Sequence, residues 1–545
     1  MSTPTAFDPA AHAHAMRSAG LWHDRTIDHY FAAAISAAPD KPALVAYRAD
    51  KGDRAEPRRF TYRELGDLVA RAAAALRGMG VGRGDVVAVQ VPNWWEFAVA
   101  ALAASRIGAV VNPLMPIFRE REMGYMLGFG EAKVLVVPRL FRGFDHAAMA
   151  RALQKECPKL QHVVVIDEHG ADGFEQRLLS GSARIEANDA ALAADDLAVI
   201  MFTSGTTGSP KGVMHDTNRL VACNNSLAER FGLTGDDVLL GCSPLGHMTG
   251  YAAVLLLGLR LGGTVVLQDL WEPRQGVTIM ARERVTYTAA STPFLTDICE
   301  AVAAGAPQPA QLRSFLCGGA PIPPVLIERA ARELDLKVCS LWGMTESLSS
   351  TLTEPARAHD KSATSDGRPL PGVDVRIVDE QGAALPVGTT GRLLVRGAQM
   401  FIGYYKRPDI ATFDAEGWFD TGDLAYADAE GYIRINGRSK DVLIRGGENV
   451  PVVEIEALLY KHPAVLEASL VGYPDARLGE RGCACVVLRP GARLDLPALQ
   501  AYMAECKVAK QYWPERVLVM EAMPRTPSGK VQKFRLREMA VDPAR

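Results

Sequence analysis

Ten consecutive residues, Thr203 to Gly212, read TSGTTGSPKG and consist almost entirely of turn formers, hydroxyl side chains and one lysine. Backbone amides of a glycine-rich turn, with hydroxyl and ammonium groups beside them, can bind the oxygens of a polyphosphate. The segment is not a Walker A loop, because Lys211 stands three residues after Gly208 and is followed by glycine. A flexible surface turn is the alternative, but the residue types and their order favour a phosphate-binding loop of another kind.

The stretches on either side of this loop indicate which elements hold it. The run DDLAVIMF before it is apolar and β-rich, whereas VMHDTNRLVACNNSLAERFG after it has the periodicity of a helix. The sequence thus predicts that the loop joins a strand to a helix. The candidate phosphate ligands are Thr203, Ser204, Gly205, Thr206, Thr207, Gly208 and Lys211.

Five further segments carry groups suited to nucleotide chemistry, and all lie downstream of the loop. Taken singly, each has an ordinary explanation: a carboxylate such as Glu346 is usually solvated, TGD suits a capped turn, and a lysine in a Ser-Gly loop is usually exposed charge. Their order behind the loop is what favours a shared site. They are FLCGGAPIPP from residue 315, LWGMTES from 341, GWFDTGDLA from 417, GYIRINGRSKD from 431 and PRTPSGKVQKF from 524.

Together the six segments resemble, in order, the motifs of the acyl-adenylate-forming family, which comprises acyl-CoA synthetases, adenylation domains of non-ribosomal peptide synthetases, and luciferases. The resemblance covers about Thr26 to Arg537, and the sequence looks most like bacterial short- and medium-chain fatty acyl-CoA synthetases and cyclohexanecarboxylate-CoA ligases. It implies an enzyme that uses ATP and Mg²⁺ to convert a carboxylic acid to acyl-AMP, releasing pyrophosphate. Coenzyme A then takes the acyl group as a thioester, and AMP leaves.

The resemblance also implies roles for individual residues. It places Thr345 at the α-phosphate and Glu346 at Mg²⁺, a hard cation that prefers oxygen ligands. The family more often has Tyr where Trp342 stands, although either ring can stack on a base. The implied nucleotide contacts besides the loop are Gly318, Gly319, Ala320, Trp342, Gly343, Asp423 and Arg438.

Near the C-terminus the resemblance implies a catalytic lysine and a moving domain. Lys530 would bridge the substrate carboxylate and the α-phosphate during adenylation, and would then have to withdraw before the thiol enters. The family rotates its small domain about a residue that corresponds to Lys440 here. The segment RGGEN would then face the active site, with Arg445 at a phosphate of coenzyme A and with Gly446 and Gly447 lining a channel for pantetheine.

The resemblance places the acid side of the site around PLGHMTGYAAVLLLGLRLGG, residues 244–263. The helix in this segment has no charged residue before Arg260, and no acidic residue stands where amino-acid-activating relatives hold an amine. These features favour a medium-chain fatty acid or an alicyclic acid such as cyclohexanecarboxylate, with benzoate-like acids next. The candidate acyl-pocket residues are His247, Met248, Tyr251 and Phe294, of which His247 is also a candidate catalytic residue unless it is only a core histidine.

Two other functions stay open on the sequence. An acyl-AMP ligase would load the phosphopantetheine of a carrier protein instead of coenzyme A, so consumption of free coenzyme A distinguishes it. A nucleotide-binding switch or NTPase would release ADP rather than AMP, and would need no acid.

The elements that must position these residues predict an α/β fold. In the first 190 residues, helical patterns alternate with short β-rich runs such as DVVAVQVP, which is typical of largely parallel sheets. From about Arg376, short strands and turns dominate. We therefore expect a large N-terminal domain of parallel and mixed sheets with helices and a small β-rich subdomain (1–437), a hinge (438–441) and a small mobile α+β C-terminal domain (442–545).

Composition narrows the class of protein and its partners. A chain of 545 residues is long for one core, and a net charge of −3 gives no broad basic field for nucleic acid. Nine scattered cysteines without a CxxC pair are expected to be reduced thiols. Without a signal peptide or an apolar run of spanning length, we expect a cytoplasmic protein whose partners are a small carboxylic acid, ATP and coenzyme A. For oligomeric state, a homodimer is only the general expectation.

Overall fold

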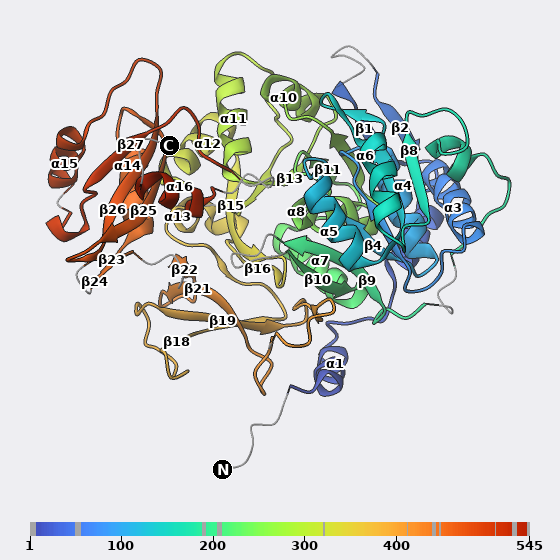
Figure 1. The fold of residues 1–545 in the computed structure, drawn as a ribbon, viewed down its shortest axis with the longest axis horizontal. Helices are drawn as coiled ribbons and strands as arrows, with labels where there is room; N and C mark the ends of the chain where they lie inside the picture. The colour runs from blue at the N-terminus through green and yellow to red at the C-terminus, as the bar shows by residue number, and fades with distance from the viewer. Residues whose placement is uncertain are drawn as a thin grey trace.

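The computed structural model describes residues 7–49, 56–187, 192–203, 210–319, 322–410, 412–438, 443–445, 448–506, 508–525 and 531–541. Within these ranges the chain forms a large α/β part with two main sheets, a small β-rich part and a C-terminal part with its own sheet (Figure 1). This arrangement confirms the predicted fold class.

The first sheet has seven strands: β3 (Val86–Val89), β4 (Val110–Pro113), β5 (Ala132–Pro138), β8 (His162–Ile166), β9 (Leu197–Thr203), β10 (Lys211–Asp216) and β20 (Gly403–Tyr404). Their order is β20-β10-β9-β4-β3-β5-β8. The strands from β9 to β8 in this order pair in parallel, whereas β10 pairs antiparallel with β9 and β20. The segments between the early strands form α3 (Tyr62–Gly78), α4 (Trp95–Arg106), α5 (Glu120–Gly130), α6 (His146–Glu156), the π-helix η2 (Glu175–Leu179) and the small hairpin β6 (Leu140–Phe141) and β7 (Phe144–Asp145).

The second sheet has nine strands: β1 (Pro42–Tyr47), β2 (Arg58–Thr61), β11 (Val238–Gly241), β12 (Thr264–Gln268), β13 (Tyr287–Ala290), β14 (Ser314–Gly318), β15 (Lys337–Met344), β16 (Leu348–Leu352) and β17 (Arg368–Pro369). Their order is β17-β16-β15-β14-β13-β11-β12-β1-β2, with parallel pairing from β15 to β1. Its helices are α7 (Thr217–Phe231), α8 (Met248–Gly250), the π-helix η4 (Tyr251–Leu256), α9 (Leu257–Leu261), α10 (Pro273–Arg282), α11 (Thr292–Ala303), α12 (Pro324–Leu334), η5 (Pro355–Arg357) and α13 (Ala358–Lys361).

Local sequence accounts for the central elements of the first sheet. Strand β3 reads VVAV, and β5 reads AKVLVVP, which is apolar apart from Lys133. Both are buried on both faces except at Lys133, as parallel strands covered by helices require. Helix α3 begins at a capping box, in which the Thr61 hydroxyl accepts from the Glu64 N–H and the Glu64 carboxylate accepts from the Thr61 N–H. Helix α4, WEFAVAALAASR, is buried nearly all round, in keeping with its apolar sequence.

One predicted element is wrong. The glycine-rich segment joins β9 to β10 rather than to a helix, and these strands pair antiparallel with Thr203 opposite Lys211. Helix α7 begins only at Thr217. The run KGVMHD forms a strand because β10 pairs with β9 and β20, and this pairing buries Val213 and His215. Helical periodicity does not reveal such a tertiary contact.

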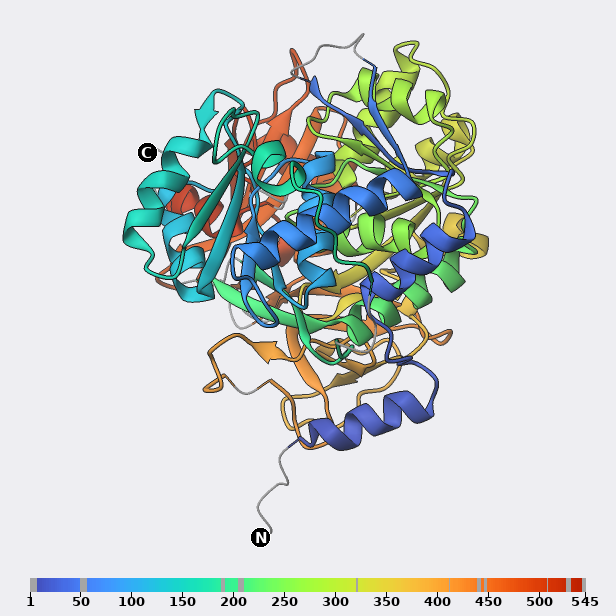
Figure 2. The same cartoon turned by 90° about the vertical axis from the view of Figure 1, so that its right-hand side faces the viewer.

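The small β-rich part is a four-stranded antiparallel sheet. Figures 1 and 2 show helix α1 (Pro9–Ser18) beside this sheet, at the end of the molecule where the chain begins. Just after α1, Trp22 Nε1 donates to the carbonyl oxygen of Ala398 at 2.8 Å, and helix α2 (Ile27–Ala37) then enters the large part. The strands, in spatial order, are β18 (Val373–Val378), β19 (Gly391–Gly397), β21 (Phe419–Ala427) and β22 (Ile433–Arg438).

The C-terminal part has a separate hydrophobic core around a five-stranded sheet. Ion pairs and hydrogen bonds inside this part join its elements, among them Arg445 with Glu515, Arg525 with Glu467 and Lys533 with Glu456. Its strands are β23 (Leu443–Arg445), β24 (Glu448–Val450), β25 (Val465–Asp475), β26 (Gly479–Leu488) and β27 (Arg516–Val519), and its helices are α14 (Val452–Lys461), α15 (Leu496–Glu505), η6 (Lys510–Tyr512) and α16 (Lys533–Val541).

The cysteines match a further prediction. All nine cysteines are free thiols, and eight of them are buried. No helix in the described ranges is long and apolar enough to cross a membrane.

Candidate active site

The two ends of the glycine-rich loop lie opposite each other at the same end of β9 and β10. Thr203 is the last residue of β9 and Lys211 the first of β10, and they are partners in the strand register. The loop residues between them that were predicted as phosphate ligands, Ser204 to Gly208, lie outside the described residues. Lys211 Nζ lies 4.6 Å from the centroid of the Tyr404 ring, within cation–π range.

Tyr404 also reaches Glu346, so it connects the loop lysine to the predicted Mg²⁺ carboxylate. Its hydroxyl donates to Glu346 Oε1 at 2.9 Å, and both side chains are buried. Burial and the neighbouring carboxylate raise the pKa of Tyr404, so the phenol keeps its proton and remains a donor. Tyr404 cannot be recognised from the sequence, because its place beside the loop depends on the pairing of β20 with β10.

The donor chemistry at Glu346 fits Mg²⁺. A carboxylate is the hard oxygen ligand that this ion prefers, and proteins commonly hold it with one or two carboxylates together with substrate phosphates. Among the described residues there is no cluster of three or more His, Cys, Asp or Glu side chains that could hold a metal ion. Glu346 therefore suits an ion that arrives with a polyphosphate substrate.

The residues predicted for the base and the ribose lie in contact. Trp342 Nε1 donates to Asp423 Oδ2 at 2.8 Å, and both side chains are buried. Asp423 lies on β21 directly opposite Arg438, the last residue of β22. The hydrogen bond fixes the indole relative to the carboxylate, so a nucleotide would meet a preset pair of groups.

The glycines of this region have structural reasons of their own. A Cβ atom on Gly318 would lie 2.9 Å from the carbonyl oxygen of Leu341, and one on Gly343 would lie 2.0 Å from that of Leu348. Gly319 has a φ of +84°, a conformation that glycine adopts without strain. Close packing of β14, β15 and β16 thus requires Gly318 and Gly343, and the backbone conformation favours glycine at 319, whether or not a purine also approaches them.

A buried histidine that the sequence did not single out forms a hydrogen bond with the backbone of Thr345. His215 Nε2 donates to the carbonyl oxygen of Thr345 at 2.7 Å, and its Nδ1 has no hydrogen-bond partner among the described residues. Burial lowers the pKa of His215 to about 4, so the ring is neutral near pH 7. The only sequence signal is a polar residue at an inward-facing position of KGVMHD, which is visible once that run is known to be a strand.

We expect His215→Phe to raise the KM for ATP about 5- to 10-fold, because a buried hydrogen bond contributes about 1 kcal/mol and its loss frees the Thr345 carbonyl.

Because the native pKa of His215 lies below that of free imidazole, His215 stabilises the fold above about pH 6.5, and this contribution is lost as the pH falls towards 4. ATP–pyrophosphate exchange measures KM, and thermal unfolding from pH 7 to pH 4.5 measures the second effect. A variant with the wild-type KM and the same acid sensitivity contradicts both roles.

On the acid side, His247 caps the helix that carries the predicted acyl pocket. Its Nδ1 accepts a hydrogen bond from the Thr249 N–H at 3.2 Å, which fixes the orientation of the ring. Met248 and Tyr251 follow and are both buried, with the Tyr251 ring centroid 6.1 Å from that of Phe97. Three of the four predicted acyl-pocket residues thus lie on one short segment.

A buried asparagine ties this segment to the first sheet. Asn93 Nδ2 donates to the carbonyl oxygens of Gly241 and Ser243 at 3.0 Å and of Gln268 at 3.2 Å. Its Oδ1 accepts from the Leu245 N–H at 2.9 Å. The chain that leads into α8 is therefore held in place by a fully bonded amide.

The fourth acyl-pocket residue packs elsewhere. Phe294 of α11 lies edge-on to Trp271 with ring centroids 5.1 Å apart, against a cluster of buried residues around Cys317. Met248 and Tyr251 belong to a different cluster. The structure does not group Phe294 with the other three.

The predicted coenzyme A contact at Arg445 is already engaged. Its guanidinium pairs with both carboxylate oxygens of Glu515, at 3.0 and 2.9 Å, and Arg481 shares the same carboxylate at 3.2 Å. The predicted residues that lie outside the described part of the chain, besides those of the loop, are Ala320, Lys440, Gly446, Gly447 and Lys530.

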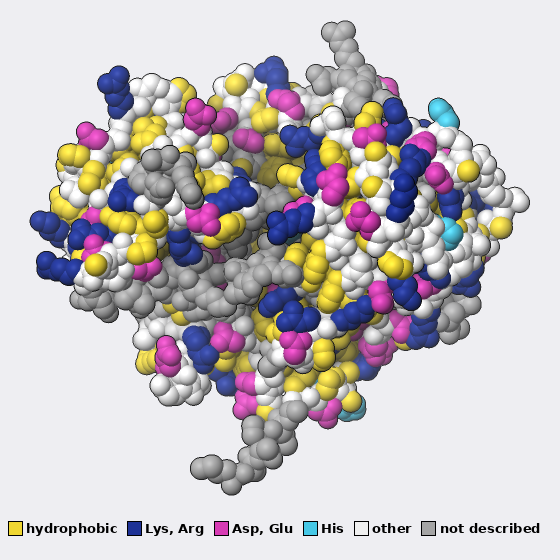
Figure 3. Space-filling model, in the orientation of Figure 1, with side chains coloured by type: hydrophobic (Ala, Val, Ile, Leu, Met, Phe, Trp, Pro, Cys, Tyr) yellow, Lys and Arg dark blue, Asp and Glu magenta, His cyan; other side chains and the backbone are white. Residues whose placement is uncertain are grey.

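The surface is hollowed between the C-terminal part and the large part on the face that Figure 3 shows. Lys and Arg side chains stand along the large-part rim of this hollow in the same view, with Asp and Glu side chains among them.

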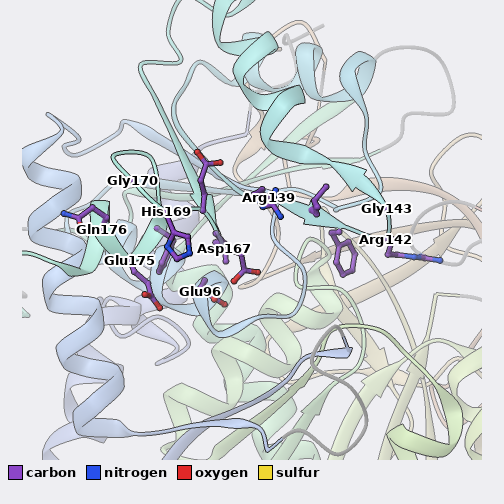
Figure 4. A pocket seen from close by; sticks show the side chains of 14 residues that line it. Glu96, Arg139, Arg142, Gly143, Asp167, His169, Gly170, Glu175 and Gln176 are labelled. Carbon is purple, nitrogen blue, oxygen red and sulfur yellow. The ribbon is translucent and has the colours of Figure 1, made fainter.

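A cavity of 720 Å³ lies apart from these residues, where β5 and β8 end (Figure 4). No predicted site residue in the described ranges lines it. Two of its acidic residues are already paired, Asp167 with Arg48 and Glu168 with Arg151. The cavity therefore does not belong to the site assembled above.

Glu96, on the floor of this cavity, makes stability depend on pH. Glu96 is 4 % exposed, its Oε1 lies 3.7 Å from an Arg48 guanidinium nitrogen, and its Oε2 has no hydrogen-bond partner among the described residues. Burial raises the pKa of Glu96 from 4.5 to about 8. The native state therefore keeps a proton that the unfolded chain releases, so stability is greatest below about pH 4.5 and declines as the pH rises towards 8.

We expect Glu96→Gln, which keeps the shape without the titration, to stabilise the protein by about 2–4 kcal/mol at pH 8 and to have little effect at pH 5. Thermal unfolding midpoints of variant and wild type at the two pH values measure this difference. Parallel shifts of both proteins with pH would show that Glu96 is not the titrating group.

Comparison with known proteins agrees with this geometry. The family model of the AMP-binding enzymes matches residues 31–405, and that of the AMP-binding enzyme C-terminal domain matches residues 454–530. The chain therefore belongs to the AMP-binding enzyme family. The crystal structure of ATP-bound MatB from Rhodopseudomonas palustris is similar with a TM-score of 0.83 and 29% identity, covering 95% of this chain and 100% of that one.

Two curated relatives extend over nearly the whole chain. The medium-chain fatty-acid–CoA ligase of Escherichia coli K12 is 36% identical over 532 residues, 96% of this chain and 92% of that protein. A salicylyl-CoA synthase / salicylate adenylyltransferase from Streptomyces is 34% identical over 545 residues, 97% of this chain and 96% of that protein. The predicted enzyme class is confirmed: the protein is an AMP-forming acyl-CoA synthetase that uses ATP and coenzyme A, with Mg²⁺ as the usual partner of ATP.

Proposed function

We propose that the protein activates a medium-chain fatty acid or an alicyclic acid as its adenylate and transfers it to coenzyme A. The connected set on the phosphate side, Lys211–Tyr404–Glu346, carries the adenylation step of this proposal. It places an ammonium group and a buried carboxylate against one tyrosine, beside the ends of a glycine-rich loop. Such an arrangement suits a triphosphate and its cation.

In the first half-reaction a carboxylate oxygen of the acid attacks the α-phosphorus of ATP. The bond from that phosphorus to the bridging oxygen breaks, acyl-AMP forms and pyrophosphate leaves. Both reactants are anionic, so fixed positive charge lowers the cost of their approach. In our proposal Lys211 offsets the charge of the leaving pyrophosphate, Lys530 lies at the junction, and Glu346 holds Mg²⁺, which neutralises phosphate charge when bound.

In the second half-reaction the thiol sulfur of coenzyme A attacks the acyl carbonyl carbon, and the bond from that carbon to the AMP oxygen breaks. We propose that residues 442–545 rotate about a hinge at 438–441, centred on Lys440, relative to residues 1–437. The separate core and the internal hydrogen bonds of the described C-terminal part support an independently moving unit. Arg445 and Glu515 both belong to the rotating part, so their ion pair would move with it, and Arg445 would have to exchange Glu515 for a phosphate of coenzyme A.

The acid preference rests on the segment after His247. Met248, Tyr251 and the residues up to Leu259 are buried, and the first charged residue is Arg260. An apolar wall without a charged partner favours an aliphatic or alicyclic body over an amino acid. The Escherichia coli relative acts on medium-chain fatty acids, which agrees with this preference.

The test is a panel of acids scored by pyrophosphate release with ATP, Mg²⁺ and coenzyme A. It should include short and medium straight-chain acids, cyclohexane- and cyclohexenecarboxylate, benzoate and salicylate. We expect the highest kcat/KM for a medium-chain or alicyclic acid and stoichiometric acyl-CoA. A preference for salicylate or benzoate, or acyl transfer only to a carrier protein, would overturn the proposed substrate and acceptor, respectively.

A further inference from the structure

The helix that carries Met248 and Tyr251 changes its hydrogen-bond pattern in the middle. It begins as α8, continues as the π-helix η4 over Tyr251–Leu256, and ends as α9. In a π-helix each carbonyl accepts from the residue five ahead instead of four, so each hydrogen-bonded loop contains one additional residue. Such turns are rare, and they occur frequently at functional sites.

Asn224, on the neighbouring helix α7, bonds to this turn. The carbonyl oxygen of Ala252 accepts the π-type hydrogen bond from the Leu257 N–H, and Asn224 Nδ2 donates to the same oxygen at 2.9 Å. In a regular α-helix that oxygen would instead accept from the Leu256 N–H, along the helix axis. The side-chain amide supports the carbonyl in the position that the π-helical turn requires.

Stability alone does not explain this amide. Asn224 is 0% exposed, and its Oδ1 has no hydrogen-bond partner among the described residues. A buried acceptor without a partner costs free energy, and an apolar side chain of similar size would avoid that cost. The effect of Asn224 on the turn accounts for a polar group at this position.

We propose that Asn224 is a positioning residue that sets the acid preference of the enzyme by holding the π-helical turn open. The inference rests on the acyl pocket of the proposed function. If the turn closed to α-helical geometry, residues on one side of it would shift by one position, roughly 100° around the helix axis. Met248 and Tyr251 would then be turned relative to Val254 and Leu255, so the four side chains would present a different surface to the acid.

The test measures kcat and KM for a series of straight-chain and alicyclic acids, and KM for ATP, in wild type, Asn224→Leu and a control. Ser226→Ala is the control, because Ser226 is also buried on α7 but donates to Ala222 and Pro371 carbonyl oxygens rather than to the turn. For Asn224→Leu we expect a 5- to 10-fold higher KM for the best acid, a changed ranking of acids, and an ATP KM within about twofold of wild type. Ser226→Ala should keep the ranking.

A second variant covers the case in which Asn224→Leu does not fold. In Asn224→Asp the side chain can donate to Ala252 only when its carboxyl is protonated. The ratio of its acid KM to that of wild type should therefore fall towards one as the pH is lowered from 8 to 6, which a merely structural defect would not produce.

Three results would overturn the inference: an unchanged ranking and acid KM in Asn224→Leu, equal effects in Asn224→Leu and Ser226→Ala, or a pH-independent ratio for Asn224→Asp. In each of them the wild-type enzyme still activates acids, so the proposed function stands. A wild-type enzyme that releases no pyrophosphate with any acid would overturn the proposed function, and this inference with it.

Discussion

Lys530→Ala is expected to lower the rate of acyl-AMP formation about 10²- to 10³-fold while leaving thioester formation from synthetic acyl-AMP nearly unchanged. The acid carboxylate and the α-phosphate are both negative, and an ammonium between them offsets their repulsion only as they approach. In the second half-reaction that repulsion is absent, and the lysine would block the entering thiol. ATP–pyrophosphate exchange and single-turnover transfer from acyl-AMP to coenzyme A measure the two steps separately.

Lys533→Ala is the matched control for this prediction. Lys533 is a neighbouring lysine whose Nζ pairs with Glu456 Oε1 at 2.7 Å inside the C-terminal part. Its loss should affect the stability of that part without changing the ratio of the two half-reaction rates. Equal losses of both half-reactions in Lys530→Ala would contradict the role proposed for Lys530.

The second large effect is expected at Glu346. Glu346→Gln preserves the side-chain shape and an acceptor for the Tyr404 hydroxyl, but removes the charge that suits a divalent cation. We expect kcat/KM for ATP to fall about 10²-fold, with a higher Mg²⁺ concentration needed for half-maximal rate. Titration of Mg²⁺ at fixed ATP in the pyrophosphate-exchange assay measures both quantities.

Tyr404→Phe tests the hydrogen bond to the Glu346 carboxylate separately from the charge of that carboxylate. It leaves Glu346 in place and removes one hydrogen-bond donor, so we expect a loss of about 10-fold or less. If Glu346→Gln and Tyr404→Phe have equal effects, or if the Mg²⁺ dependence of Glu346→Gln matches wild type, Glu346 does not hold the ion.

The sequence predicts much of the fold because the parallel strands are largely apolar runs and the segments between them have helical periodicity. The family resemblance implies that Trp342 and Asp423 serve one nucleotide, and the structure joins these distant residues by a hydrogen bond. Their roles in nucleotide binding stay predictions. Both inferences depend on local patterns: strand burial in one case, and short motifs in a fixed order in the other.

What the sequence does not reveal depends on contacts between distant segments. The strand β10 looks helical until its pairing with β9 and β20 is known, and Tyr404 meets Glu346 only through that pairing. His215 and Asn224 act on backbone carbonyls of other elements, at Thr345 and Ala252, and no periodicity records such bonds. The π-helical turn likewise lies within a uniformly apolar run.

The most direct test of the account follows an oxygen atom. With ¹⁸O-labelled carboxylic acid, ATP, Mg²⁺ and coenzyme A, an acyl-adenylate route leaves one acid oxygen on the phosphate of AMP, because the thiol breaks the bond between the carbonyl carbon and that oxygen. We predict AMP with one ¹⁸O atom, unlabelled pyrophosphate and one acyl-CoA per AMP, as measured by mass spectrometry. ADP with phosphate, or AMP without the label, would contradict the account.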